Sequence, residues 1–240
     1  MAYSLTTSGE RDRVRALMDY NILDSLPEQD YDDITQLASE ICQTPISLIS
    51  LVDDSRQWFK SNHGLSVRET PKEFAFCTHT IQNPSQVFIV TDSREDERFA
   101  QNPLVTDDPN VIFYAGAPLI DSRGFGLGSL CVIDHNPRVL TENQLVALQT
   151  LAKHVVSMIE LRKADRSMKT LQRAFEESHH ETQKAHHLLK SDFSPQILSA
   201  IQGLESLTPL PDLQNKKDAA EKLGSAIQLL QQLQQVIKDL

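Results

Sequence analysis

The stretch that decides the fold is Pro45-Ile46-Ser47-Leu48-Ile49-Ser50-Leu51-Val52-Asp53. It is short, apolar and rich in β-branched residues, which is typical of a buried strand. The turn-forming run Asp53-Asp54-Ser55 follows, and the chain then returns as a second strand-like segment, 56–61. The two segments predict an antiparallel hairpin, and the rest of the domain is arranged around it.

The segments on either side of the hairpin predict a mixed domain. Upstream, apolar residues at helical spacing predict helices over 11–20 and 30–41, with Asp30 as the N-cap of the second. Downstream, the proline-containing segment 62–110 predicts mostly loop with one strand and short helices. Two more strands are predicted at 113–120 and 127–133. The fold class is therefore α+β, with a largely antiparallel sheet.

A long helix is predicted to begin at Thr141. Thr141 and Gln144 form a capping-box pattern, and neither Gly nor Pro interrupts the following run of about fifty residues. A coiled-coil seam is predicted where residues recur at alternating steps of three and four. Its members are Leu161, Ala164, Met168, Leu171, Phe175, Ser178, Thr182, Ala185 and Leu189.

Upstream, the same helix carries a second apolar series. It consists of Leu148, Leu151, Val155 and Met158. From Met158 to Leu161 the step is three residues, whereas the alternation of three and four requires four. Such a discontinuity locally overwinds a coiled coil. We therefore expect the helix to carry a signal as a change of coil geometry.

The C-terminal part predicts a helical hairpin. Ser194-Pro195 either restarts a helix or kinks a continuous one, 209–211 is a stiff connector, and a last helix covers 223–240. One apolar stripe per helix is best buried by a second copy, which predicts a homodimeric four-helix bundle. The expected domains are the α+β domain (1–140), a connecting helix (141–190) and the dimerising hairpin (191–240).

Composition narrows the class of protein. The 240 residues are 40% hydrophobic and 23% charged with a net charge of -10, which suits a globular protein that repels phosphate backbones and anionic lipid. We therefore expect no nucleic-acid or membrane partner. Cys42, Cys77 and Cys131 form no C-x-x-C pair, and neither a signal peptide nor a long apolar run is present. A cytoplasmic location is expected.

A series of segments carries a family resemblance. They are YNILD (20–24), PISLISLVD (45–53), RQWFKS (56–61), FCTH (76–79), RFAQNPLV (98–105), FYAGAPL (113–119) and LGSLCVID (127–134). In this order they resemble the GAF domains attached to bacterial histidine kinases and diguanylate cyclases. The resemblance implies a central antiparallel sheet with helices on both sides.

The C-terminal hairpin resembles the dimerisation and phosphoacceptor helices of histidine kinases. The matching residues are KSDFSP (190–195) and IQGL (201–204). Ser191 stands where the phosphoacceptor His is found in kinases, and the spacing from Asp192 to Pro195 is one residue short. No glycine-rich nucleotide-binding boxes follow, so a degenerate hairpin without autophosphorylation is expected.

The GAF resemblance implies a small-molecule pocket between the sheet and its covering loops. The candidate contacts are Trp58, Cys77, His79, Arg98, Asn102 and Tyr114. Two have alternative roles: Trp58 as a core residue, and Arg98 as a surface ion pair with nearby acidic residues. Cys77 and His79 have no second ligand cluster, so no metal is predicted, and Cys77 is not followed directly by the His of bilin-binding patterns. The cyclic-nucleotide motif of other GAF domains is absent, and the ligand and any cofactor are unidentified.

The expected function is that of a homodimeric signalling sensor with no catalytic residues. A ligand-bound state would act through the coiled coil on a signalling kinase or response regulator. The alternatives are a ligand-free adaptor that docks such a partner and a thiol-dependent reductase. Four histidines of the long helix have two interpretations: a phosphoacceptor, metal or pH-sensing cluster, or a solvated helix face. They are His179, His180, His186 and His187.

Overall fold

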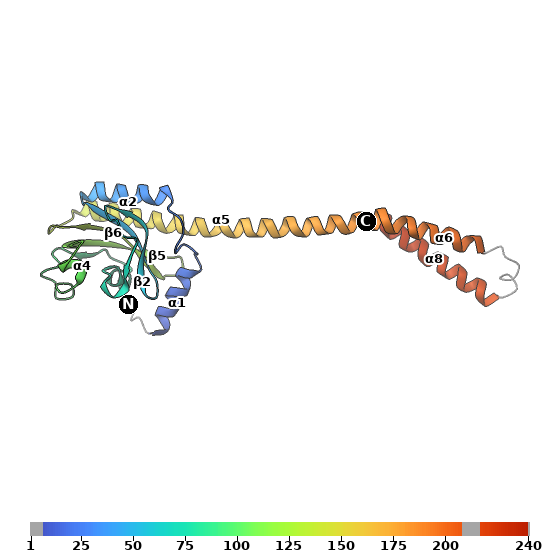
Figure 1. Cartoon of the computed structure of the whole chain (residues 1–240), viewed down its shortest axis with the longest axis horizontal. Helices are drawn as coiled ribbons and strands as arrows, with labels where there is room; N and C mark the ends of the chain where they lie inside the picture. The colour runs from blue at the N-terminus through green and yellow to red at the C-terminus, as the bar shows by residue number, and fades with distance from the viewer. Residues whose placement is uncertain (1–6, 208–216, 240) are drawn as a thin grey trace. The chain divides into compact units, whose positions relative to one another are not determined.

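The computed structural model describes residues 7–207 and 217–239, and the chain forms two compact units, 1–166 and 167–240. Figure 1 shows their elements in chain order. The first unit contains α1 (Thr7–Met18), α2 (Gln29–Cys42), β1 (Ile46–Val52), β2 (Arg56–His63), β3 (Glu69–Pro71), a 3-10 turn (Lys72–Phe74), α3 (Cys77–Gln82), β4 (Phe88–Val90), α4 (Pro103–Thr106), β5 (Phe113–Ile120) and β6 (Gly126–Asp134). Helix α5 (Glu142–Leu188) begins in the first unit and ends in the second.

The six strands form one antiparallel sheet in the order β3-β2-β1-β6-β5-β4. The predicted β1–β2 hairpin is confirmed, with Leu51 opposite Trp58 and a bulge between Ile49 and Ser50. Every residue of β1 is buried, which agrees with its run of apolar and small side chains. The α+β fold is therefore as predicted.

Each face of the sheet has its own hydrophobic core. On one face, α2 and the first part of α5 cover the strands (Figure 1), and residues such as Tyr31, Trp58 and Val155 pack together. On the other face, α3, α4 and the long loops supply a second cluster that includes Phe76, Phe99 and Tyr114. Strand residues alternate between these cores because successive side chains point to opposite sides of a sheet.

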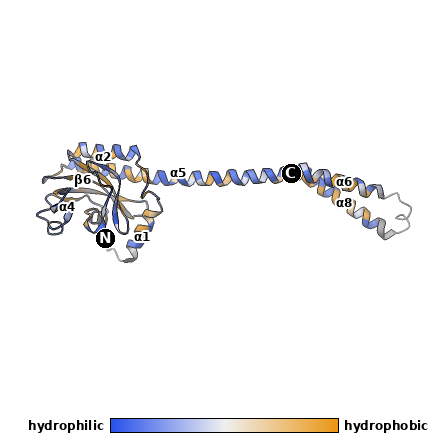
Figure 2. Ribbon diagram, in the orientation of Figure 1, coloured by the Kyte–Doolittle hydropathy of each residue, from blue (hydrophilic) through white to orange (hydrophobic). Residues whose placement is uncertain are grey.

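The structure corrects the prediction for the start of α5. Within the first unit α5 buries a single stripe, Leu148, Ala152, Val155 and Ile159, against the sheet-side core. Leu148 and Val155 therefore belong to the core of the first unit and not to a coiled-coil series that slips phase at Leu161. Figure 2 shows hydrophobic patches separated by hydrophilic ones along the helix. The capping box is confirmed, because Thr141 Oγ1 accepts a hydrogen bond from the Gln144 amide at 3.3 Å.

The boundaries of the first two helices also differ from the prediction. Helix α2 begins at Gln29 after Glu28, so Asp30 lies inside its first turn and is not the N-cap. Helix α1 lies several residues earlier than the predicted 11–20. It is anchored by Arg13, a buried cation that donates to the Val52 carbonyl at 2.7 Å and is paired with Glu10. Apolar spacing alone does not reveal this polar anchor.

The second unit is helical. After α5 come a π-helical turn (Leu189–Phe193), α6 (Ser194–Leu207) and α8 (Lys217–Asp239). The helix runs continuously through Ser194-Pro195. Of the two predicted alternatives, the continuous helix is therefore correct. The predicted connector 209–211 lies outside the described residues. Ile201 and Ile237 are buried, whereas three apolar residues of α8 stay exposed: Leu229, Leu233 and Val236.

A buried lysine links the sheet, the loop before α2 and helix α5. The Lys60 side chain is 0% exposed, and its ammonium donates to Ser25, to the Leu26 carbonyl and, at 2.6 Å, to Glu28. Arg162 of α5 also contacts the Glu28 carboxylate, at 3.1 Å. Burial opposes the charge of Glu28, but Lys60 and then Arg162 outweigh it and lower the pKa of this carboxyl.

Glu28→Gln is therefore expected to destabilise the first unit by about 2 to 4 kcal/mol at neutral pH, because it leaves a buried ammonium without its counter-charge. The carboxylate contribution exists above the normal carboxyl pKa and is lost as the pH falls through the lowered one. The difference from wild type should therefore shrink on acidification. Urea unfolding at several pH values measures this. Glu40→Gln, on the exposed face of α2, is the control, and equal losses in both variants would contradict the prediction.

Candidate functional site

Most of the predicted site residues surround an aromatic cluster on the loop-covered face of the sheet. Phe76 and Phe99 stack with ring centroids 4.0 Å apart, and Phe76 also stacks on Tyr114 at 5.1 Å. His79 of α3 meets Phe99 edge-on at 5.0 Å and stacks on Phe88 at 5.7 Å. Among the described residues this space is filled by the domain's own rings. The cluster occupies the place where the family resemblance implies a ligand.

Arg98 and Asn102 hold the rim of this cluster. The Arg98 guanidinium lies over Phe88 at 5.0 Å and over Phe99 at 5.2 Å, and it pairs with Asp96 at 2.5 Å. It is therefore both an ion-pair residue and a cap on the rings. The Asn102 side chain accepts from the Leu104 amide at the start of α4 and donates to a backbone carbonyl, so its local role is to shape the loop. Burial, and then the nearby Arg98, lower the pKa of His79.

A buried hydrogen-bond network lies beneath the rings, between α3 and the sheet. The Tyr114 hydroxyl is 2.9 Å from Thr80 Oγ1, 3.2 Å from Ser129 Oγ and 3.3 Å from Cys77 Sγ. Ser129 Oγ in turn donates to Cys77 Sγ at 2.9 Å. The groups satisfy one another in an apolar core, which stabilises one arrangement of α3 on the sheet. A Cβ at Gly116 would collide with the Tyr114 hydroxyl, so the network also needs glycine there.

The three thiols are buried, so none is presented to a substrate at the surface. Burial raises the pKa of Cys42 to about 11. A hydrogen bond to Cys77, reinforced by burial, holds the pKa of Cys131 well above its usual value. Burial also opposes ionisation of Cys77, but hydrogen bonds from Cys131 and Ser129 outweigh it and lower that pKa. Ionisation of Cys77 therefore opposes ionisation of Cys131.

Trp58 lies apart from the other five predicted residues. It is 5% exposed and belongs to the core on the helix-covered face, with Tyr31 and Val155. The sheet separates it from Tyr114, which lies in the opposite core. The structure thus does not bring all six residues together, and their role in ligand binding stays a prediction.

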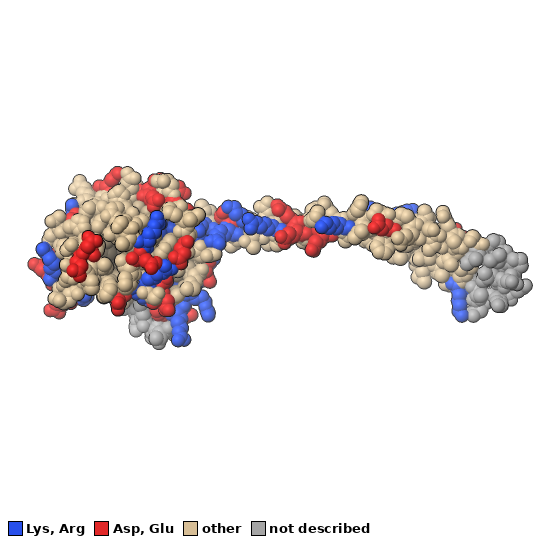
Figure 3. Space-filling view, in the orientation of Figure 1, with Lys and Arg blue, Asp and Glu red and all other residues tan. Residues whose placement is uncertain are grey.

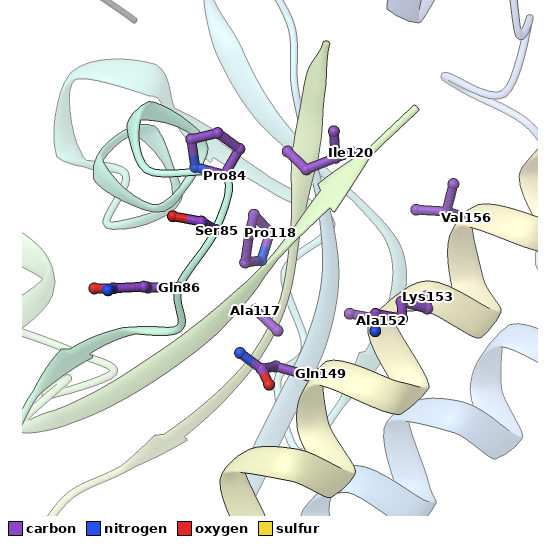
Figure 4. A pocket seen from close by; sticks show the side chains of 10 residues that line it. All are labelled: Pro84, Ser85, Gln86, Ala117, Pro118, Ile120, Gln149, Ala152, Lys153 and Val156. Atoms are coloured by element: carbon purple, nitrogen blue, oxygen red, sulfur yellow. The ribbon is translucent and has the colours of Figure 1, made fainter. Parts of the chain in front are cut away.

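A pocket of about 430 Å³ opens beside the C-terminal half of β5 (Figure 4). It exists because β4 is short and pairs with β5 only at Tyr114–Gly116, which leaves the rest of β5 at the sheet edge. Its lining comes from the loop before β4, from β5 and from α5. The residues are Pro84, Ser85, Gln86, Ala117, Pro118, Ile120, Gln149, Ala152, Lys153 and Val156. The sequence prediction missed this pocket.

The pocket has the chemistry of a small-molecule site. Prolines and aliphatic side chains form its walls, and Gln86, Gln149 and the exposed Lys153 supply amide and ammonium groups. Its volume lies in the range of ligand sites, about 300 to 1,000 Å³. The α5 lining lies beside the core stripe of the same helix, so an occupant would touch the helix that leads out of the domain.

Two findings concern metals and membranes. Among the described residues, no cluster of His, Cys, Asp and Glu is arranged to hold a metal ion. None of the helices in the described part of the chain is long and apolar enough to cross a membrane.

On the face shown in Figure 3, basic and acidic side chains are mixed. In the second unit, His179 stacks on Phe175 and contacts Gln183 at 3.0 Å on an exposed helix face.

Comparisons with known proteins place the fold and correct one prediction. The chain is 42% identical over 139 residues to the cyclic di-GMP phosphodiesterase PA2567 of Pseudomonas aeruginosa, a match that covers 58% of this chain and 24% of that protein. The prediction of a protein without catalytic activity is wrong on this finding, since the curated relative is named as an enzyme. The chain spans about a quarter of that relative's length.

A family model and one solved structure support the fold. The GAF domain of a phosphoenolpyruvate-protein phosphotransferase from Coxiella burnetii aligns with a TM-score of 0.50 at 14% identity, covering 68% of this chain and 99% of that one. That from Acinetobacter aligns with a TM-score of 0.48 at 20% identity, covering 65% and 95%. The GAF domain family model matches residues 27–159, more than half of the chain. The chain therefore belongs to the GAF domain family of signalling sensors.

Proposed function

We propose that the chain is a ligand-sensing regulatory module whose signal leaves the GAF domain through helix α5. The observation that carries this proposal is that α5 contributes residues both to the domain core and to the pocket. Leu148 and Val155 pack in the domain core, whereas Gln149 and Lys153 line the adjacent pocket. A ligand that favours one position of this helix shifts the population of domain conformations toward it.

The output is a dimer assembled on the later part of α5 and the hairpin that follows. Leu161, Met168, Leu171 and Phe175 are 66% to 70% exposed, and with Ala164 after Leu161 they recur at steps of three and four. Such a row is stabilised by a second helix of the same kind. The exposed apolar residues of α8 give the hairpin a similar unburied face. The dimer, the kinase-like character of the hairpin and the three domain limits, 1–140, 141–190 and 191–240, are parts of this proposal.

The curated relative suggests what such a module regulates. Its name is that of a cyclic di-GMP phosphodiesterase, and the match extends over 139 residues, 58% of this chain. We infer that the present module controls a signalling enzyme of this kind, or a kinase or response regulator, through the geometry of its dimer. The pocket favours a ligand with a negative charge, which Lys153 binds, and an apolar part that contacts Pro118 and Ile120.

A second candidate is a ligand-free adaptor. The observation that favours it is the aromatic filling between the sheet and the loops, where Phe76, Phe99 and Tyr114 stack on one another. In this version the dimer docks its partner without a small molecule. The two candidates differ in whether the pocket beside α5 is used.

Native mass spectrometry of freshly purified protein separates them. The sensor predicts a dimer with extra non-covalent mass that is lost, or bound about tenfold more weakly, in Lys153→Glu, because a charge-assisted contact of about 1.5 to 3 kcal/mol is reversed. Lys184→Glu, an exposed α5 position away from the pocket, is the control and should retain that mass. A wild-type dimer without added mass contradicts the sensor and favours the adaptor.

A further inference from the structure

Inside the first unit, α5 presents three different faces. The core face carries Leu148, Ala152, Val155 and Ile159, and the pocket flank carries Gln149, Lys153 and Val156. The third face lies opposite the core face, and its residues belong neither to the core nor to the pocket lining. They are Asn143, Thr150, His154 and Ser157, and all four are exposed. With 3.6 residues per turn, His154 and Ser157 project on the side of the helix away from the buried stripe.

This outer face is in register with the proposed dimer seam. From Leu161 the seam continues to Ala164 and Met168 by steps of three and four. The same alternation runs backwards from Leu161 without a break. It passes through Ser157, His154, Thr150, Ala147 and Asn143. The face that is exposed in the structure and the face required by the heptad repeat are thus the same.

We infer that a second copy of this chain packs on this outer face, so that the dimer seam extends over the GAF domain and His154 meets the partner's His154. The inference rests on the proposed dimer. The other seam positions here are small or uncharged, which allows two backbones to come close, whereas charged Lys153 lies beside the seam. In a parallel coiled coil, residues at a core position contact their own counterparts. His154 occupies the same heptad position as Leu161 and Met168.

The surroundings of His154 make this contact sensitive to pH. Among the described residues, no hydrogen bond or ion pair includes His154, and the adjacent charge is Lys153. Several charged groups on α5 and on the elements next to it are already engaged. Glu28 pairs with Lys60 and Arg162, Glu160 accepts from Tyr20 and Ser122, Lys163 lies over the Tyr20 ring, Arg166 donates to Asn21, and Asp33 and Glu40 bond within α2.

The sign of the pH effect follows from this arrangement. Two protonated imidazoles packed together, with a lysine beside each, would repel one another, so protonation of His154 opposes association. The His154 contact therefore weakens the dimer on acidification. Further along the seam, His186 lies where it would face the partner's Glu181, and acidification would strengthen that pair. The two effects therefore have opposite signs.

Cysteine cross-linking of the full chain tests the extended seam. Ser157→Cys is expected to cross-link efficiently with a short bismaleimide, because the two copies of this position lie against each other. Met168→Cys tests the proposed dimer alone, and Arg173→Cys, on the outer side of the same helix, is the control. The native thiols are buried and should not react. If Met168→Cys cross-links but Ser157→Cys reacts only as much as Arg173→Cys does, the extended seam is overturned and the proposed dimer stands. If neither Met168→Cys nor Ser157→Cys cross-links, the extended seam and the proposed dimer are both overturned.

The dissociation constant of the dimer tests the His154 contact. Between pH 8 and pH 5.5 we expect the wild-type dimer to weaken about tenfold relative to His154→Leu, which lacks this repulsion. His154→Leu should bind more tightly and lose this weakening, whereas His180→Leu, on the outer side of α5, should keep it. Sedimentation velocity measures both variants. A His154→Leu dimer that weakens on acidification as wild type does would overturn the inference.

Discussion

Replacing Leu161 and Met168 together with asparagine is expected to convert the dimer into a monomer. Both side chains are exposed in the single chain, at 70% and 66%, and both lie at core positions of the seam. Burying each contributes about 1.5 kcal/mol or more, and a dimer contains two copies of each. The dissociation constant should therefore rise by about three orders of magnitude or more. One asparagine is tolerated in many coiled coils, which is why both positions are changed.

The experiment is sedimentation velocity over a range of protein concentrations. Arg173→Asn with His180→Asn, on the outer side of the same helix, is the matched control and should stay dimeric. The thermal transition of the GAF domain should be the same in all variants, because neither Leu161 nor Met168 is part of its core. A double variant that stays dimeric at low concentration contradicts the proposed assembly.

The strand arrangement could be predicted well from the sequence, for a physical reason. The run Ile46–Val52 contains only aliphatic residues and two small serines, so it can be buried on both faces, and the turn residues after it favour a hairpin. Helix α5 was harder. Leu148 with Val155 and Leu151 with Met158 both fit helical spacing, and only the fold shows which pair faces the sheet. The buried stripe continues through Ala152 and Ile159.

The candidate site could be predicted only in part, because it depends on contacts between distant segments. Trp58 and Phe59 are neighbours in the sequence but face opposite cores, and nothing local to them tells which core carries the loops. The pocket beside α5 depends on where β4 stops pairing with β5. Pro84 and Pro118 are the signals that could have marked this gap, since proline removes a ladder donor.

Gly128→Ala is expected to destabilise the GAF domain strongly. Gly128 lies in β6 between β1 and β5, opposite Leu51 on one side and Leu119 on the other. A Cβ there would overlap the Ser50 carbonyl oxygen and lie 2.8 Å from the Leu51 Cα, both backbone atoms of the central strand. Backbone cannot move aside as a flexible side chain does, so the cost is about 4 kcal/mol or more. For a domain of this size that lowers the melting temperature by about 10 °C or more.

The matched control makes the same chemical change where space is free. Gly203 lies in α6, and a Cβ added there meets no atom within 4 Å. Gly203→Ala should stabilise its helix by up to about 1 kcal/mol and leave the GAF transition unchanged. Urea and thermal unfolding of the full chain, followed by near-ultraviolet circular dichroism of Trp58, report on the GAF domain. If Gly128→Ala unfolds at the wild-type midpoint, the close approach of β1 and β6 is not as the structure has it. The two strands would then be separated enough to accept a side chain.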